Sequence, residues 1–282
     1  MQHLAPDVEW LIERAISEDL GIGDPTTDLL IPSDLQGTAQ VLSKADGVLA
    51  GVEVGLAVFS RIDANLRTTA VMSDGDPVKD RTVVAEIQGS VASILKGERT
   101  ALNFMQRLSG IATATAAYVS EVEGHDVRII DTRKTTPGLR SLEKQAIRAG
   151  GGFNHRQNLG DGILIKDNHI QALKATGMSL GEIVKSAHDG KSHTINVEVE
   201  VEDLGQVEEA LKAGASILLL DNMDTEQMAA AVQLCKGKAV TEASGGITFE
   251  TIRQVAATGV DLISVGALTH SAKALDLSLD LL

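Results

Sequence analysis

The chain of 282 residues contains a single cysteine, so it forms neither an internal disulfide nor a zinc site built from several cysteines. The surrounding sequence, AVQLCKGK, indicates an amphipathic helix in a reducing compartment, with Cys235 as an unreactive, half-buried thiol. The length corresponds to one large or two modest domains with a sizeable core. A small protein held together by disulfides is therefore excluded.

Aromatic residues make up only 2% of the chain, which leaves few side chains for stacking on single-stranded nucleic acid. The net charge of -14 also repels a phosphate backbone. No apolar run approaches the roughly 20 residues that span a bilayer, and the N-terminus mixes acids and bases through its apolar positions, unlike a signal peptide. We therefore expect a soluble, cytoplasmic protein with no nucleic-acid partner and no membrane segment.

The second part of the chain alternates short apolar runs with helix-like segments. Three of these segments end at Gly214, Gly237 and Gly259, where a glycine commonly ends a helix. Nearly continuous apolar strands at regular spacing predict a parallel α/β barrel, with an open doubly wound sheet as the alternative. The predicted strands are 127–132, 163–167, 195–201, 217–222, 239–244 and 262–268.

The first part of the chain predicts a different arrangement, an α+β domain over residues 1–110. We expect a helix near residues 6–19, followed by strands around 36–52 and 67–90. A long helical tract from about 93 to 122 comes next, with Ser109-Gly110 as an interruption. The barrel domain then covers residues 111–268, and the final stretch, 269–282, is expected to pack back onto the N-terminal domain.

A polar residue or a glycine stands at or near the carboxyl end of every apolar run. In a parallel barrel this edge carries the reactive loops, so we expect these residues to converge on one site. Any one of them alone would carry little weight, because a strand must end somewhere and polar ends are common. The residues concerned are Asp131, Arg133, Lys134, Lys166, Glu200, Asp221, Glu242, Ser244 and Gly266.

Residues 128–170 hold eight Lys or Arg against four Asp or Glu, so this region is basic within an acidic chain. A basic cleft of this kind attracts and holds a small polyanion. Arg140, Lys144 and Arg148 belong to this basic set, but they are spaced four residues apart on a predicted helix, so a solvated helix face or a partner contact is the alternative for them.

Glycine stretches at 150–152, 244–246 and 265–267 are suited to wrapping a phosphate with backbone amides, although glycine also serves plain turns. No Walker motif and no dinucleotide-binding motif is present. His155 and His169 lie in polar, glycine-rich surroundings that favour a site role, with a structural histidine as the alternative. Their spacing of 14 residues gives no zinc signature.

The segment DTRKTTPGLRSLEKQAIRAGGGFNHRQNLGDGILIKDNHI, residues 131–170, closely resembles the signature of the quinolinate phosphoribosyltransferases, the carboxylating nicotinate-nucleotide pyrophosphorylases. The resemblance covers essentially the whole chain in order and at compatible spacing. It implies an N-terminal, open-sandwich-like α+β domain joined to an incomplete parallel α/β barrel. The other matching segments are GERTALNFMQRLSGIAT (97–113), VEVEVEDL (197–204), LLLDNM (218–223), EASGGI (242–247) and ISVGALTHSAKALDLSLDL (263–281).

The resemblance also implies an activity: phosphoribosyl transfer from 5-phosphoribosyl 1-pyrophosphate to quinolinate with decarboxylation, a step of NAD biosynthesis. Lys134, Lys166, Glu200 and Asp221 are then the catalytic residues. Glu200 and Asp221 are also the implied ligands of magnesium, which arrives with the phosphoribosyl substrate, and no organic cofactor is expected. The alternation in VEVEVE leaves three glutamates on one face, and only the resemblance selects Glu200 among them.

The substrate-binding residues are likewise implied by the resemblance. It implies a homodimer in which one of these residues, Arg99, is offered to the site of the neighbouring subunit. The full set is Arg99, Thr132, Arg133, Lys134, His155, Arg156, Lys166, Glu200, Asp221, Ser244, Gly245, Gly246, Val265, Gly266 and Ala267.

Three other functions remain open on the sequence. A related phosphoribosyltransferase-like protein acting on another acid should depart from the TRKTTPG and NHR residues, and this chain keeps them. A barrel lyase or aldolase would use Lys134 or Lys166 as a Schiff-base nucleophile, which leaves the arginines and the acidic pair without a role. A non-catalytic anion-binding protein would keep the cleft without turnover.

Overall fold

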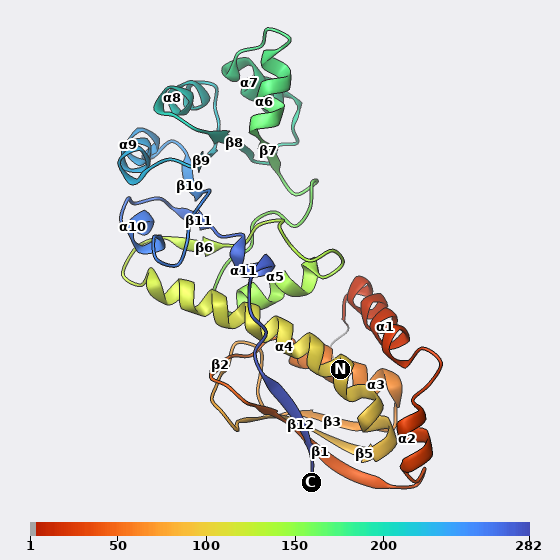
Figure 1. Ribbon diagram of the computed structural model, residues 1–282. Coiled ribbons are helices and arrows are strands. Elements are labelled where there is room, and N and C mark those ends of the chain that lie inside the picture. Colours follow the sequence, from red (N-terminus) through yellow and green to blue (C-terminus); the bar gives the residue numbers. More distant parts are fainter. Residues whose placement is uncertain (1–3) are drawn as a thin grey trace. The chain divides into compact units, whose positions relative to one another are not determined.

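The computed structural model describes residues 4–282, and the chain divides into two compact units (Figure 1). Unit 1 comprises the chain up to Ala116 together with Thr135–Gly151 and Ala267–Leu282. Unit 2 comprises Ala117–Lys134 and Gly152–Gly266. The chain therefore passes between the units four times, and the boundary expected at residue 110 lies within a continuous helix, α4 (Val91–Glu121).

Unit 1 is built on an antiparallel sheet with the strand order β12-β1-β5-β3. The last strand of the chain pairs with β1, so the C-terminal segment completes the N-terminal sheet. Helix α3 packs against β3 and against α1, and its apolar residues include the fully buried Val58 and Phe59. The elements up to α4 are α1 (Pro6–Leu20), α2 (Pro25–Leu30), β1 (Gln36–Ser43), β2 (Gly47–Val48), α3 (Val52–Ile62), β3 (Arg67–Ala70), β4 (Pro77–Val78) and β5 (Val83–Ser90); β12 is Leu277–Leu281.

Helix α4 runs through Ser109 and Gly110, so the expected interruption is wrong. The hydroxyl of Ser109 is buried and bonds both the N–H and the carbonyl of Ala50. A Cβ on Gly110 would lie 2.0 Å from the carbonyl oxygen of Lys273. The pair of small residues therefore allows neighbouring backbone to approach the helix closely and does not break it.

Unit 2 contains six parallel strands in the order β6-β11-β10-β9-β8-β7. Over the described residues β6 and β7 are the two ends of this sheet, and Phe153 forms an isolated parallel bridge with Ile130 beside β6. The incomplete parallel α/β barrel is therefore confirmed. The strands are β6 (Arg128–Ile130), β7 (Ile163–Ile165), β8 (Val197–Val201), β9 (Ile217–Asp221), β10 (Val240–Ser244) and β11 (Leu262–Ser264).

The helices that follow these strands end as the glycine positions predict. Gly214, Gly237 and Gly259 all adopt positive φ angles, which glycine tolerates because it lacks a Cβ. The apolar run at 262–268 is divided, because its strand ends at Ser264 and a short helix follows. The remaining helices are α5 (Arg140–Ala149), α6 (Asp167–Lys174), α7 (Leu180–Gly190), α8 (Leu204–Lys212), α9 (Thr225–Cys235), α10 (Ile252–Ala256) and α11 (Ala267–His270).

Two side chains are more deeply buried than the sequence indicates. Cys235 is fully buried at the end of α9, where burial raises the pKa of its thiol. Lys144 is 1% exposed, so the alternative of a solvated face is wrong for it. The reason is that α5 buries Leu142, Glu143, Lys144, Ala146 and Ile147 together, while Arg148 stays exposed. Among residues 4–282, no helix is long and apolar enough to span a bilayer.

Candidate active site

The carboxyl ends of the unit 2 strands carry the residues that the sequence singles out. Asp221 ends β9 and pairs in register with Ser244 at the end of β10, while Lys166 directly follows β7. Lys166 Nζ lies 3.3 Å from Glu200 Oε2, although the lysine side chain is 48% exposed. This edge of the sheet therefore holds an acidic pair from neighbouring strands with a lysine beside it.

The side chain of Glu200 is only 9% exposed, whereas that of Lys166 is 48% exposed. Burial raises the pKa of Glu200, and the charges of Asp221 and Asp167 raise it further, while Lys166 opposes the shift. Glu200 on β8 and Asp221 on β9 lie near the carboxyl ends of neighbouring strands, so their charges interact through space. Oxygen ligands from two such carboxylates suit a magnesium ion.

The loops after β9 and β10 fit together through a glycine. A Cβ on Gly245 would lie 2.3 Å from Asn222 Oδ1, and Gly245 has a φ of +88°. Asn222, which also has a positive φ, donates its backbone N–H to the carbonyl of Ser244 at 3.0 Å and its side-chain amide to Asp221 Oδ2 at 2.7 Å. Gly245 is therefore required by close approach as well as by backbone conformation.

Asp131, at the end of the first run, organises a loop and is fully buried. Its Oδ1 accepts the backbone N–H of His155 at 2.7 Å, and its Oδ2 accepts the side-chain amide of Asn154 at 2.8 Å. At the next residue, Thr132 Oγ1 accepts the backbone N–H of Lys134 at 3.0 Å. The buried carboxylate thus fixes the NHR segment in place, a structural role that its position at a strand end does not distinguish from a substrate contact.

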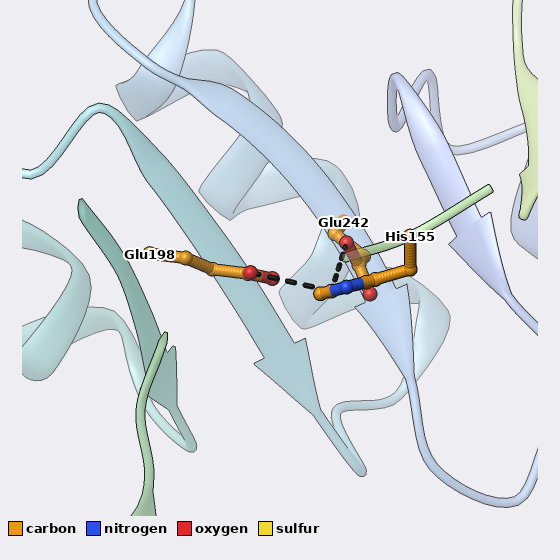
Figure 2. Close-up of side chains that lie close together, drawn as sticks. All are labelled: His155, Glu198 and Glu242. Atoms are coloured by element: carbon orange, nitrogen blue, oxygen red, sulfur yellow. Dashed lines mark ion pairs between the residues drawn. The ribbon is translucent and has the colours of Figure 1, made fainter. Parts of the chain in front are cut away.

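His155 lies between two buried glutamates inside the barrel (Figure 2). Its Nε2 is 3.3 Å from Glu198 Oε2 and 3.7 Å from Glu242 Oε2. The two carboxyl groups are only 6% and 2% exposed, and the Oε1 atom of each is buried with no hydrogen-bond partner among the described residues. Glu198 and Glu200 are two residues apart on β8, so their side chains point to the same face of the strand. This cluster therefore lies about 7 Å along the strand from the Lys166–Glu200 pair.

The protonation of this cluster follows from its burial. Burial and the neighbouring charge of Glu198 raise the pKa of Glu242 to about 8, although His155 opposes the shift. Glu242 is therefore mainly protonated at neutral pH. Burial lowers the pKa of His155, but the hydrogen bond with Glu198 and the charges of both glutamates outweigh it and raise the pKa overall.

Among the described residues, His155, Glu198 and Glu242 are the group whose ligand atoms are close enough to hold a metal ion, all within 4.8 Å of one another. One contact opposes this role. His155 Nδ1 accepts the backbone N–H of Arg156 at 2.6 Å, so a neutral imidazole carries its proton on Nε2, the atom that faces the glutamates. A metal would have to take the place of that proton, and we interpret the cluster as a proton-sharing network.

A cavity of about 540 Å³ adjoins the cluster. His155, Arg156, Glu198 and Glu242 line it, together with the first residues of β6, β7, β9 and β11. The cavity therefore opens toward the amino ends of the strands, whereas Lys166, Glu200 and Asp221 lie toward the carboxyl ends. The structure thus arranges the expected site residues in two neighbouring groups within one barrel.

The surroundings of Arg156 disfavour the positive charge of its guanidinium group. Burial and then the charge of Arg133 lower its pKa, while Glu198 and Asp161 raise it. Two guanidinium groups close enough to repel each other are suited to a ligand with more than one negative charge.

Other expected residues have different positions. His169 Nδ1 accepts the backbone N–H of Lys166 at 3.0 Å, so this exposed histidine fixes the start of α6. Arg99 and Ala267 belong to unit 1. Arg99 lies on α4 with 58% of its side chain exposed, and its charged neighbour is Glu98 at 3.9 Å.

Sequence reasoning missed Glu198 as a member of the site and listed Glu242 only as a polar residue near a strand end. The one available signal was the alternation in VEVEVE, which places Glu198 on the same face as Glu200. Nothing in the sequence indicated that these carboxyl groups would meet His155, because that contact joins three segments far apart in the chain.

Comparison with known proteins agrees with this arrangement. The family described as quinolinate phosphoribosyl transferase, C-terminal domain, matches residues 111–280, and the corresponding N-terminal domain matches residues 24–109. The probable nicotinate-nucleotide pyrophosphorylase (carboxylating) of Bacillus subtilis is 43% identical over 280 residues, which cover 99% of this chain and 94% of the relative.

Two further relatives extend the comparison. The mitochondrial quinolinate phosphoribosyltransferase (decarboxylating) 2a of Nicotiana tabacum is 40% identical over 293 residues, covering 98% of this chain and 83% of the relative. The solved structure of the nicotinate-nucleotide pyrophosphorylase from Francisella tularensis superposes with a TM-score of 0.92 at 39% identity, covering 99% of this chain and 98% of that one. The chain therefore belongs to the quinolinate phosphoribosyltransferase family.

Proposed function

We propose that this protein transfers the phosphoribosyl group of 5-phosphoribosyl 1-pyrophosphate to quinolinate, with decarboxylation, as the names of its relatives describe. The observation that carries the proposal is the pair Arg156 and His155 in the lining of the barrel cavity, with the charge of Arg133 near enough to lower the pKa of Arg156. Quinolinate is a planar dicarboxylate, and two guanidinium groups can each hold one carboxylate through paired hydrogen bonds. Binding of the dianion removes the repulsion between the two arginines.

The acid-binding group of residues then consists of Arg133, Arg156, His155 and Lys166. The cluster with Glu198 and Glu242 holds the imidazole of His155 in one orientation. Its position in the barrel interior, away from bulk water, strengthens charge-assisted hydrogen bonds to the substrate.

The phosphoribosyl group belongs at the carboxyl ends of the strands. Glu200 and Asp221 bind the ribose hydroxyls or the magnesium that arrives with the pyrophosphate, and they stabilise positive charge developing at the anomeric carbon. Lys134 would neutralise charge on the pyrophosphate leaving group, and magnesium held by Glu200 and Asp221 would supply further positive charge there. Backbone amides of Ser244, Gly245 and Gly246, and of Val265, Gly266 and Ala267, hold the 5-phosphate.

The reaction forms one carbon–nitrogen bond and breaks one carbon–oxygen and one carbon–carbon bond. The lone pair of the quinolinate ring nitrogen forms the bond to the anomeric carbon while the bond from that carbon to pyrophosphate breaks. The nitrogen is then positively charged, so it stabilises the electron pair that remains on the adjacent ring carbon when the carboxylate on that carbon leaves as CO2. The ring carbon takes up a proton, and the products are nicotinate mononucleotide, pyrophosphate and CO2.

We further propose that the active form is a homodimer in which Arg99 acts in the neighbouring subunit's site. The exposure of this arginine on α4 supports the assignment. Mixing inactive Arg99→Ala with inactive Lys166→Ala should restore partial activity, because one site of the mixed dimer then has both residues. Absence of recovery in verified mixed dimers would contradict a shared site.

The decisive experiment is incubation of the protein with quinolinate, 5-phosphoribosyl 1-pyrophosphate and magnesium, with products identified by mass spectrometry. Nicotinate in place of quinolinate is the control, because it lacks the carboxyl group that is lost. We expect nicotinate mononucleotide from quinolinate only. Retained binding of the phosphoribosyl substrate without product would instead indicate a different acid as the acceptor.

Arg133→Ala and Lys166→Ala should each abolish turnover while the circular dichroism spectrum stays unchanged. Near wild-type activity in either variant would refute the residue assignment without refuting the reaction.

A further inference from the structure

Unit 1 contains a buried carboxylate, Glu143 of α5, whose two oxygens both accept hydrogen bonds. Its side chain is 0% exposed. Oε2 accepts the backbone N–H of Thr136 at 3.0 Å, and Oε1 accepts the hydroxyl of Thr136 at 2.8 Å. Oε1 also accepts Nη2 of Arg107 at 2.9 Å and its Nε at 3.3 Å. A buried charge with this many donors fixes the position of each group that contacts it.

Arg107, on α4, extends the same network to a second segment. Its Nη1 donates to the carbonyl oxygen of Ala272 at 3.1 Å, and its Nη2 donates to that of Thr269. These carbonyls lie at and just after the end of α11, where a helix has acceptors without an internal partner. One planar guanidinium therefore joins three elements, α4, α5 and the chain after α11, which lie beside one another (Figure 1).

The two segments held in this way both lie just after a point where the chain passes from unit 2 into unit 1. The chain passes from unit 2 into unit 1 after Lys134 and again after Gly266. Thr136 is the second residue after the first of these passages, and Thr269 is the third after the other. Residues that the proposed function assigns to substrate lie at both passages: Arg133 and Lys134 directly precede the first, and 265–267 span the second.

We infer that Arg107 and Glu143 form a clamp that positions both substrate-binding segments, with Thr136 as its contact on the first. The role of those segments rests on the proposed function, whereas the clamp itself rests on the contacts within unit 1. Arg107 and Glu143 are positioning residues that reach the reaction through the backbone. A displacement of about 1 Å in such a segment is enough to slow catalysis by tenfold or more.

Glu143→Gln tests the clamp with a side chain of the same shape. In Gln one of the two carboxylate oxygens is replaced by an NH2 group, which accepts no hydrogen bond. If the NH2 group takes the place of Oε2, it faces the backbone N–H of Thr136; if it takes the place of Oε1, it faces the guanidinium of Arg107. In either case the loop has to move. We expect kcat/KM for 5-phosphoribosyl 1-pyrophosphate to fall by about tenfold or more, with a cooperative unfolding transition retained.

Thr136 supplies a gentler pair of variants in case Glu143→Gln fails to fold. Thr136→Val removes the hydroxyl and keeps the shape, whereas Thr136→Ser keeps the hydroxyl. We expect Thr136→Val to lower kcat/KM and Thr136→Ser to stay within about twofold of the wild type. Thr115→Val is the control for loss of a threonine hydroxyl elsewhere in unit 1, because among residues 4–282 the hydroxyl of Thr115 bonds the carbonyl of Ile111, within its own helix. Unchanged kcat/KM in Thr136→Val, or an equal loss in Thr115→Val, overturns the clamp.

Hydrogen exchange separates failure of the clamp from failure of the proposed function. Peptides covering 132–139 and 266–273 should exchange faster in Thr136→Val and Glu143→Gln than in the wild type, Thr136→Ser or Thr115→Val. This readout does not depend on turnover. If the wild type makes no nicotinate mononucleotide, the proposed function fails while faster exchange still supports the clamp; unchanged exchange in both segments overturns it.

Discussion

Replacing Glu242 by Gln should flatten the dependence of stability on pH. The carboxyl group is 2% exposed and faces Glu198 on β8, His155, and the hydroxyl of Ser264 on β11. These surroundings raise its pKa from the usual 4.5 to about 8. Because the folded-state pKa is the higher one, the folded protein binds this proton more tightly than the unfolded chain does.

The sign and size of the effect follow from this difference. The stabilisation is complete below about pH 4.5 and is lost as the pH rises through 8. At about 1.4 kcal/mol for each pH unit, wild-type protein should lose about 3 kcal/mol of unfolding free energy between pH 6 and pH 9 through this group. Glu242→Gln imitates the protonated carboxyl group, so it should lose about 3 kcal/mol less over the same interval.

Urea unfolding at several pH values between 6 and 9 measures this difference directly. Glu202→Gln is the matched control, because Glu202 belongs to the same acidic run but is exposed, and its profile should follow the wild type. Parallel profiles for wild type and Glu242→Gln would refute the argument, since they would mean that Glu242 is ionised in the folded protein throughout.

Three further predictions concern glycines and the barrel loop. Gly110→Ala should lower the unfolding free energy by about 1–3 kcal/mol in urea, because its Cβ would lie 2.0 Å from the carbonyl of Lys273, while Gly190→Ala, which meets nothing within 4 Å, should be close to neutral. Gly245→Ala should raise KM for 5-phosphoribosyl 1-pyrophosphate, because its Cβ would lie 2.3 Å from Asn222; an unchanged KM would exclude this loop from phosphate binding. Asp131→Asn should weaken quinolinate binding measured by calorimetry, because one of the two donors held by the buried carboxylate loses its acceptor.

The barrel could be predicted from sequence because its signals are local. Each strand is an apolar run, each later helix ends at a glycine, and parallel strands place their carboxyl ends at one edge. The same reasoning placed Glu200, Asp221 and Ser244 together, and the register of β9 with β10 agrees.

What escaped prediction depends on contacts between distant segments. No helix was predicted over residues 52–62, which form α3, because β-branched residues in GVEVGLAVF obscure the helical period. The burial of Lys144 and Glu143 could not be anticipated, because charged residues at helical spacing normally face water. In both cases packing against other parts of the chain overrides the local preference.

The fourfold passage of the chain between the units determines how the protein can be divided. A cut near residue 110, at the junction between the two matching family regions, would sever α4 and separate β1 from its edge partner β12. The N-terminal fragment would then present an unpaired sheet edge, and the C-terminal fragment would carry a loose strand with nowhere to pair. The two units are thus compact in space without being separable in sequence, so co-expressed halves should have to reassemble before either is stable.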